Sequence, residues 1–314
     1  MPAEVFGPDF AFLPRAELLT FEEIAMVARE LVALGARTLR ITGGEPLVRR
    51  DIARLVALLR ALDGSEELGG VPLDIALTTN GSLLAALAAP LRAAGLNRIT
   101  VSLDALTPST FARMSGSELP LARVLDGIAA ATAAGFSSIK LNAVIRRGVN
   151  DAEVPALVAF ARENGHTARF IEYMDVGTTN GWRLDEVVPA SEILQQIQSL
   201  HPLEPVEPSR PGEVASRYRF LDGRGEIGLI SSVSAPFCAD CTRARVSADG
   251  QLYTCLFAAD GMDLKRYLRP VADAQALREG LRNRWELRDD RYSELRDAAT
   301  AGRLPKVEMF RVGG

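Results

Sequence analysis

Short apolar segments alternate with longer amphipathic segments through the first half of the chain. Thr20 and Glu23 form a capping-box pattern, which predicts a helix that runs to about Leu34 and ends at Gly35. Buried strands are predicted at 37–42, 73–79, 98–103, 138–145 and 167–174, and helices at 50–64, 82–95, 121–135 and 151–164. Short strands separated by helices of about 10 to 15 residues indicate βαβ units around a parallel sheet.

This alternation stops near residue 175. Residues 202–213 are rich in proline and glutamate and predict a loop. Residues 216–232 predict a hairpin around Asp222-Gly223, and Asp249-Gly250 marks a second hairpin before a helix near 273–285. We therefore expect an α/β domain over 1–175 and a C-terminal α+β extension over 176–314.

Polar residues gather where the predicted strands end. Gly43-Gly44-Glu45-Pro46 follows the first of these strands and Thr78-Thr79-Asn80-Gly81 the second, while Ser102, Asn142 and Asp175 mark the ends of the other three. Active sites of parallel α/β proteins lie at this edge. Two adjacent glycines there let a ligand approach main-chain groups, because no Cβ shields them.

Composition excludes several classes of protein. The net charge of −4 argues against bulk attraction to nucleic acid or membranes, and no apolar run is long enough to predict a membrane span. The first residues lack the basic and apolar regions of a signal peptide, so we expect a cytoplasmic protein.

Three cysteines cluster in the extension: Cys238-x2-Cys241 and, after thirteen further residues, Cys255. A cytosolic trio of this kind indicates metal ligation more than disulfides. Zinc would need a fourth ligand such as a carboxylate or a distant histidine, whereas a four-iron cluster on three thiolates would keep one iron open to a small molecule. Reduced cysteines without metal are the third alternative.

Arg243 and Arg245 follow the cysteine pair and alternate on a predicted strand, so both side chains point the same way. Two guanidinium groups suit an anionic ligand such as phosphate. The alternative is a solvated basic face.

These residues, together with several other segments, resemble those of a known family. The segments ITGGEPL, TTNG, VSLDA, RFIEYMDVG, GEVASRYR, SVSAPFCADCTRARVSADGQLYTCLF and LRDDRYSELR, with the terminal Gly-Gly, resemble the GTP 3′,8-cyclase family of radical S-adenosylmethionine (SAM) enzymes in molybdenum cofactor biosynthesis. The likeness covers residues 1–314. It implies an incomplete, TIM-like (β/α)6 barrel and an extension that carries a second iron–sulfur cluster.

One departure from the family concerns the N-terminus. In the family a C-x3-C-x2-C motif, which holds the SAM-binding cluster, directly precedes Met-Pro, and this chain starts with Met1-Pro2. The first strand and these cysteines are therefore expected upstream of a start assigned too late, or the chain is a truncated fragment. A gene product of this form is expected to lack radical chemistry.

The resemblance also implies roles for individual residues. Gly44, Glu45, Ser102 and Met174 would contact SAM. Arg40, Thr78, Lys140, Arg169, Arg243 and Arg245 would contact GTP. Cys238, Cys241 and Cys255 would hold the second [4Fe-4S] cluster, whose open iron takes the purine, and the Gly313-Gly314 tail would enter the active site.

The activity implied by the resemblance is conversion of GTP to 3′,8-cyclo-7,8-dihydro-GTP. A 5′-deoxyadenosyl radical removes the 3′ hydrogen, and the ribose radical attacks C8 of guanine. Implied partners are GTP, a flavodoxin-type electron donor, the next pathway enzyme (cyclic pyranopterin monophosphate synthase) and a second copy in a homodimer. Alternatives are another radical SAM enzyme with an auxiliary cluster and a fragment that only binds nucleotide.

Overall fold

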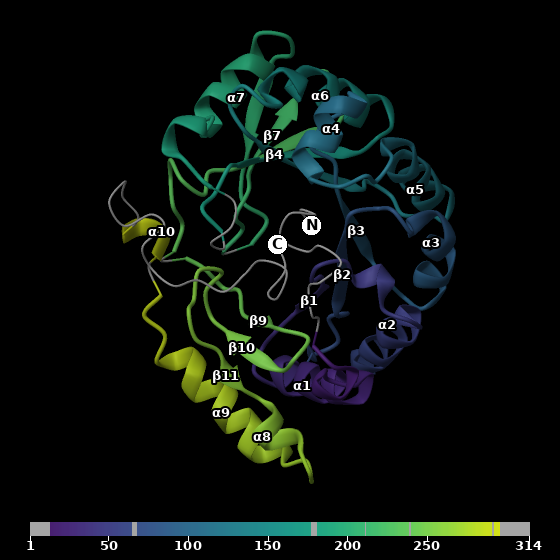
Figure 1. The fold of residues 1–314 in the computed structure, drawn as a ribbon, viewed down its shortest axis with the longest axis vertical. Coiled ribbons are helices and arrows are strands. Elements are labelled where there is room, and N and C mark those ends of the chain that lie inside the picture. Colours follow the sequence, from purple (N-terminus) through teal and green to yellow (C-terminus); the bar gives the residue numbers. More distant parts are fainter. Residues whose placement is uncertain are drawn as a thin grey trace.

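The computed structural model describes residues 13–64, 68–176, 181–210, 212–238, 240–290 and 292–295. These residues form a curved eight-stranded sheet with the strand order β1-β2-β3-β4-β5-β8-β7-β6, and a three-stranded sheet with the order β11-β10-β9. Helices line the outer side of the large sheet, so that the described chain forms a barrel that does not close (Figure 1).

The predicted βα units are confirmed. The strands are β1 (Thr38–Ile41), β2 (Asp74–Thr79), β3 (Arg98–Ser102), β4 (Lys140–Ile145) and β5 (Thr167–Glu172). The helices of this half are α1 (Phe21–Ala33), α2 (Ile52–Arg60), α3 (Leu84–Ala93), α4 (Pro108–Ser115), α5 (Leu121–Ala133) and α6 (Val154–Glu163). Neighbouring strands from β1 to β5 pair in parallel.

The capping box at the start of α1 is present as the sequence predicts. The backbone N–H of Glu23 donates to Thr20 Oγ1 at 3.1 Å, and the backbone N–H of Thr20 donates to Glu23 Oε2 at 2.7 Å. Two otherwise unpaired N–H groups are satisfied in this way, which fixes where α1 begins.

Each parallel strand has an apolar face and a polar face. The apolar face packs against the helices, and Ile75, Leu77 and Val101 are fully buried there. The alternating positions carry polar or charged side chains, among them Thr78 and Thr100, on the concave inner face of the sheet. The helices therefore bury one side of the sheet, while its other side can receive a ligand.

The extension contributes strands to the same sheet. These are β6 (Leu203–Val206), β7 (Ser216–Phe220) and β8 (Glu226–Ile230), and α7 (Ala190–Gln198) precedes them. The predicted hairpin at 216–232 is confirmed as β7–β8, and β8 also pairs in parallel with β5. The segment that follows β8 thus begins at the carboxyl edge of the parallel strands.

The prediction of a loop over 202–213 is wrong at its start, because β6 pairs with β7 in antiparallel register. Pro205 lies within β6, the last strand in the sheet order. A proline lacks the N–H that a central strand needs, but an edge strand tolerates it. The proline-rich composition therefore concealed an edge strand.

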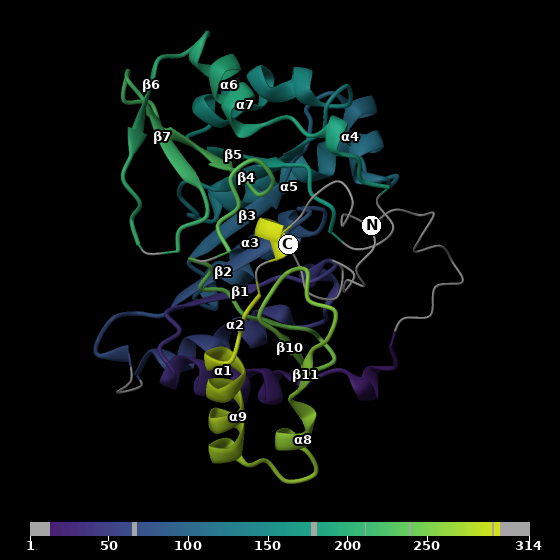
Figure 2. The ribbon, with the colours of Figure 1, turned by 90° about the vertical axis from the view of Figure 1, so that its left-hand side faces the viewer.

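A smaller unit follows, built from β9 (Arg245–Val246), β10 (Gln251–Tyr253), β11 (Met262–Asp263), α8 (Lys265–Leu268), α9 (Ala274–Glu286) and α10 (Tyr292–Leu295). The second predicted hairpin is confirmed as β9–β10, and α9 is the helix expected near 273–285. Leu252, Leu277 and Leu281 pack with Leu19 and Val27 near α1. Figure 2 shows α8 and α9 beside α1, below the barrel. Among the described helices, none has the length and apolar character that crossing a bilayer requires.

Candidate active site

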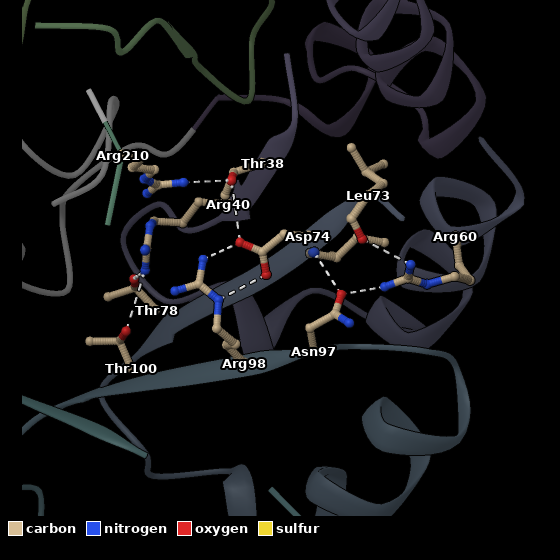
Figure 3. A network of polar contacts seen from close by, with 11 residues as sticks. Thr38, Arg40, Arg60, Leu73, Asp74, Thr78, Asn97, Arg98, Thr100 and Arg210 are labelled. Atoms are coloured by element: carbon tan, nitrogen blue, oxygen red, sulfur yellow. Dashed lines mark hydrogen bonds and ion pairs between the residues drawn. The ribbon is translucent and has the colours of Figure 1, made fainter. Parts of the chain in front are cut away.

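Cationic side chains line the inner face of the sheet. Arg40 projects from β1, Lys140 from β4 and Arg169 from β5. Arg40 Nη1 donates to Thr78 Oγ1 at 2.9 Å and to Thr100 Oγ1 at 3.3 Å, so its guanidinium extends across β2 and β3 (Figure 3). The structure thus brings together the barrel residues that the sequence assigned to GTP.

The positive charges on the inner face repel one another, and this repulsion lowers their pKa values. Burial lowers the pKa of Arg40 to about 10, and the charges of Arg169 and Arg98 add to this effect. Burial also lowers the pKa of Lys140 to about 8, and Arg169, Arg98 and Arg40 contribute in that order. Glu213 opposes this shift. An anion on this face would relieve the mutual repulsion.

An ion pair lies where β2 and β3 begin. Arg98 Nε donates to Asp74 Oδ1 at 2.8 Å, and its Nη2 contacts the other carboxylate oxygen. Thr38 bridges Asp74 to Arg210, whose Nη1 donates to Thr38 Oγ1 at 3.0 Å (Figure 3). Asp74 therefore offsets the charge of Arg98 where β2 and β3 begin.

Beside this network, Arg60 of α2 donates to the carbonyl oxygen of Leu73 at 2.9 Å and to the side chain of Asn97. Asn97 in turn accepts from the backbone N–H of Ile75 at 2.8 Å. These contacts join α2 to β2 and to the segments that lead into β2 and β3.

The Gly-Gly-Glu-Pro turn lies where β1 ends. Gly43 has φ +137°, a conformation that side chains disfavour. Glu45 accepts hydrogen bonds from Thr79 Oγ1 at 2.8 Å and from the backbone N–H groups of Asn80 at 2.7 Å and Leu47 at 3.0 Å. Its carboxylate therefore ties the turn to the end of β2, whereas Gly44 is exposed.

The other two residues assigned to SAM lie at the same edge. Ser102 is exposed at the end of β3, and Met174 lies two residues beyond the end of β5, half-buried. Both residues lie at the carboxyl ends of parallel strands, as Gly44 does. No described contact tests their role toward SAM, so the assignment of all four residues stays a prediction.

The three cysteines are free thiols, each half-buried. The backbone N–H of Cys241 donates to the carbonyl oxygen of Cys238 at 3.1 Å, which closes a tight turn. Two donors approach the sulfurs: Arg243 Nη2 lies 3.3 Å from Cys241 Sγ, and Phe257 N lies 3.4 Å from Cys255 Sγ. Hydrogen bonds to sulfur of this kind tune iron–sulfur clusters.

The thiol pKa values also show that the sulfurs interact. Burial raises the pKa of Cys255, and the charges of Asp290, Cys238 and Cys241 raise it further. Burial acts in the same direction on Cys241, but the charge and hydrogen bonds of Arg243 outweigh it and lower the pKa. Three nearby thiolates would repel one another, and a cationic cluster would offset that repulsion. Among the described side chains, no three His, Cys, Asp or Glu residues converge as a site for a single metal ion.

The arginines beside the cysteines share the electrostatic field of the barrel face. Burial lowers the pKa of Arg245 to about 10, and the charge of Arg243 lowers it further. The pKa of Arg169 is lowered mainly by burial, and the charge of Arg243 is among the smaller causes. Arg243 also lies over the ring of Phe237, 5.1 Å from its centroid. The charge of Arg243 thus reaches Arg169 on the barrel face, although its effect is small.

A cavity of about 340 Å³ adjoins the cysteine turn and is lined by Pro208, Arg210, Gly212, Glu213, Phe237 and Asp240. Gly212 has φ +73°, and a Cβ there would lie 2.6 Å from Thr242 Oγ1 and 2.9 Å from the carbonyl oxygen of Asp240. The loop before β7 thus packs closely against the cysteine turn.

Two contacts at the end of β5 were missed by sequence reasoning. Tyr292 donates to Asp175 Oδ2 at 2.7 Å and stacks on Phe257 at 4.5 Å between centroids. Glu172, the last residue of β5, is 1 % exposed and accepts several hydrogen bonds. The sequence carried a signal for Glu172, because the alternation of side chains along β5 predicts an apolar residue at this position. The Gly313-Gly314 tail lies outside the described residues.

Two protein families match the chain. The family described as "Radical SAM superfamily" matches residues 6–161, and "Molybdenum Cofactor Synthesis C" matches residues 166–294. Among solved structures, "Native anSMEcpe with bound AdoMet" aligns with a TM-score of 0.51 at 13% identity, covering 77% of this chain and 68% of that one. That likeness supports the fold alone.

Curated relatives are similar along the whole chain. Proteins named GTP 3′,8-cyclase from Acidothermus cellulolyticus, Xanthomonas axonopodis pv. citri and Staphylococcus aureus (strain MRSA252) are 53%, 50% and 44% identical to it. Each alignment covers 100% of this chain and 91% of the relative.

Proposed function

We propose that this chain, which belongs to the GTP 3′,8-cyclase family of radical SAM enzymes, holds the triphosphate of GTP on the inner face of its barrel. The purine then points toward the cysteine turn. Family membership gives the reaction, a step of molybdenum cofactor biosynthesis, and implies SAM and a [4Fe-4S] cluster as cofactors. The residues that bind GTP and the cluster at the three cysteines belong to the proposal.

The grouping of Lys140 with Arg40 and Arg169 on one face of the sheet is the observation that carries this proposal. The Lys140 side chain lies near Arg40 and Arg169. Its pKa of about 8 reflects burial and like charges, which Glu213 only partly offsets. Natural proteins rarely bury unpaired cations, so an anionic ligand is the expected partner. A triphosphate offers the several negative charges that such a set can bind.

The cysteine turn suits the other end of the same ligand. When bound, a [4Fe-4S] cluster on Cys238, Cys241 and Cys255 supplies an iron with a coordination position not filled by a cysteine, and the SAM cofactor supplies the radical. Arg243 donates to the sulfur of Cys241, and its positive charge also contributes to the lowered pKa of Arg169. The protein's own part is to hold the substrate rigidly between these groups.

The division at residue 175, the cytoplasmic location, the flavodoxin-type donor, the next pathway enzyme and the homodimer stay predictions. For the triphosphate site, the test is anaerobic calorimetry of GTP and of guanosine with the protein, Arg169→Met and Arg29→Met. Arg29 is exposed on α1 and serves as the matched control for lost charge.

We expect Arg169→Met to weaken GTP binding at least tenfold, as the loss of a charge-assisted hydrogen bond does, and to leave guanosine binding unchanged. Arg29→Met should leave both unchanged. Equal losses for GTP and guanosine, or no loss in Arg169→Met, would place the triphosphate elsewhere.

A further inference from the structure

Glu172 is a buried carboxylate on the face of β5 that packs against the helices. Ala168 and Phe170, which share its side of β5, belong to the apolar core between sheet and helices. Glu172 is 1 % exposed in that environment. A buried carboxylate is costly unless donors surround it, so its partners show what it does.

Four donors converge on its two oxygens. Oε1 accepts from the backbone N–H of Ala190 at 2.7 Å, at the start of α7, and from the hydroxyl of Ser234. Oε2 accepts from the backbone N–H groups of Val233 at 2.7 Å and Ser234 at 2.8 Å. A carboxylate has about four lone-pair directions, and this one uses them on α7 and on the segment after β8.

That segment, residues 231–238, leads directly to the cysteine turn. Ser234 precedes Cys238 by four residues. A further backbone bond, from Ala235 N to the Ser231 carbonyl oxygen at 3.2 Å, shapes the chain around Ser234. The carboxylate thus holds Val233 and Ser234, a few residues before the turn that carries Cys238 and Cys241.

We propose that Glu172 is a positioning residue for the cysteine turn: it fixes residues 231–238 to β5 and α7, and thereby sets the places of Cys238 and Cys241. Its role toward a cluster rests on the proposed function, whereas its hold on the segment does not. Cys255 follows β10 and reaches the site by a separate route.

The test compares Glu172→Gln with Glu153→Gln. Glu153 is the matched control, because its Oε2 also accepts two backbone bonds of a loop, from Leu106 at 2.9 Å and Thr107 at 3.2 Å. The readout is the alkylation rate of each cysteine in the metal-free, reduced protein, resolved by mass spectrometry. The chain has three cysteines, so every thiol is followed.

Glutamine presents an N–H₂ group where an oxygen now accepts, so we expect Cys238 and Cys241 to react about tenfold faster, as loss of one charge-assisted bond in a local opening equilibrium allows. Cys255 should keep its rate, and Glu153→Gln should change none of the three. Ser234→Ala removes one donor and should give a smaller increase at the same two cysteines. It keeps the test decisive if Glu172→Gln does not fold.

Equal acceleration of all three cysteines, or the same pattern in both glutamine variants, would overturn the proposal. Iron uptake after anaerobic reconstitution tests the proposed cluster separately from the positioning role of Glu172. Faster alkylation together with reduced iron uptake supports both the positioning role and the cluster. Faster alkylation in a protein that takes up no iron even as wild type supports the positioning role and contradicts the proposed cluster.

Discussion

If GTP binds as proposed, we expect Lys140 to make its binding depend on pH. Its pKa is about 8 in the free protein, mainly because of burial and then because of the charges of Arg169, Arg98 and Arg40. A bound triphosphate would favour the protonated form. Binding should therefore be strongest below pH 8 and weaken above it.

The magnitude follows from the pKa. About three quarters of the Lys140 side chains are protonated at pH 7.5 and about 3% at pH 9.5, so the affinity should fall about 25-fold over this range if the ammonium is required. The phosphates do not titrate in this window, because their last pKa lies near 6. At pH 8.5, binding should take up about three quarters of a proton.

The assay is anaerobic calorimetry of GTP binding at several pH values, each in two buffers of different ionisation enthalpy. The difference between buffers gives the number of protons taken up. In Lys140→Met we expect weak binding that does not vary over this range. In Lys140→Arg we expect binding without the pH dependence, because the guanidinium stays charged throughout.

Two results would refute the reasoning. One is a change below threefold for the natural protein between pH 7.5 and 9.5. The other is a pH dependence that persists in Lys140→Met, which would assign the titration to a different group.

Three further predictions concern the cysteine turn and its surroundings. Arg243→Met should raise the pKa of the Cys241 thiol, because a charge and a donor to sulfur are lost. The pH dependence of alkylation in metal-free protein measures this change. Gly212→Ala should destabilise the protein more than Gly223→Ala. Both glycines have φ near +73°, but only at Gly212 would an added Cβ lie within 4 Å of other atoms. Urea unfolding should show a loss of about 1–2 kcal/mol for Gly223→Ala and a larger loss for Gly212→Ala, and equal losses would contradict the close packing. Tyr292→Phe should lower the free energy of unfolding by about 1–3 kcal/mol, because it leaves a buried carboxylate at the end of β5 without its hydroxyl donor; an unchanged urea midpoint would argue against that bond.

The sequence predicted well wherever one local pattern decides the structure. The five βα units and the capping box at Thr20 follow from periodicity and from a three-residue spacing, and both are confirmed. It failed at β6, because the strand exists through its pairing with β7, while its own composition favours a loop. Local signals do not report such distant pairings.

The candidate site divides in the same way. The cations and cysteines were named from their residue types and from the family resemblance, and the structure places Arg40, Lys140 and Arg169 on neighbouring parts of one sheet. Glu172 was missed because its partners are backbone N–H groups about 18 and 61 residues away. Only the folded chain reveals that these groups converge.

The position of β8 also has a consequence for synthesis of the protein on the ribosome. β8 lies between β5 and β7, although more than fifty residues separate it from β5 in the chain. Until residues 226–230 have emerged, the hydrogen-bonding edge of β5 has no strand beside it, and such an edge invites pairing with other chains. Slow translation beyond β5 would therefore prolong the interval in which nascent chains can aggregate, and chaperones would be needed most during that interval.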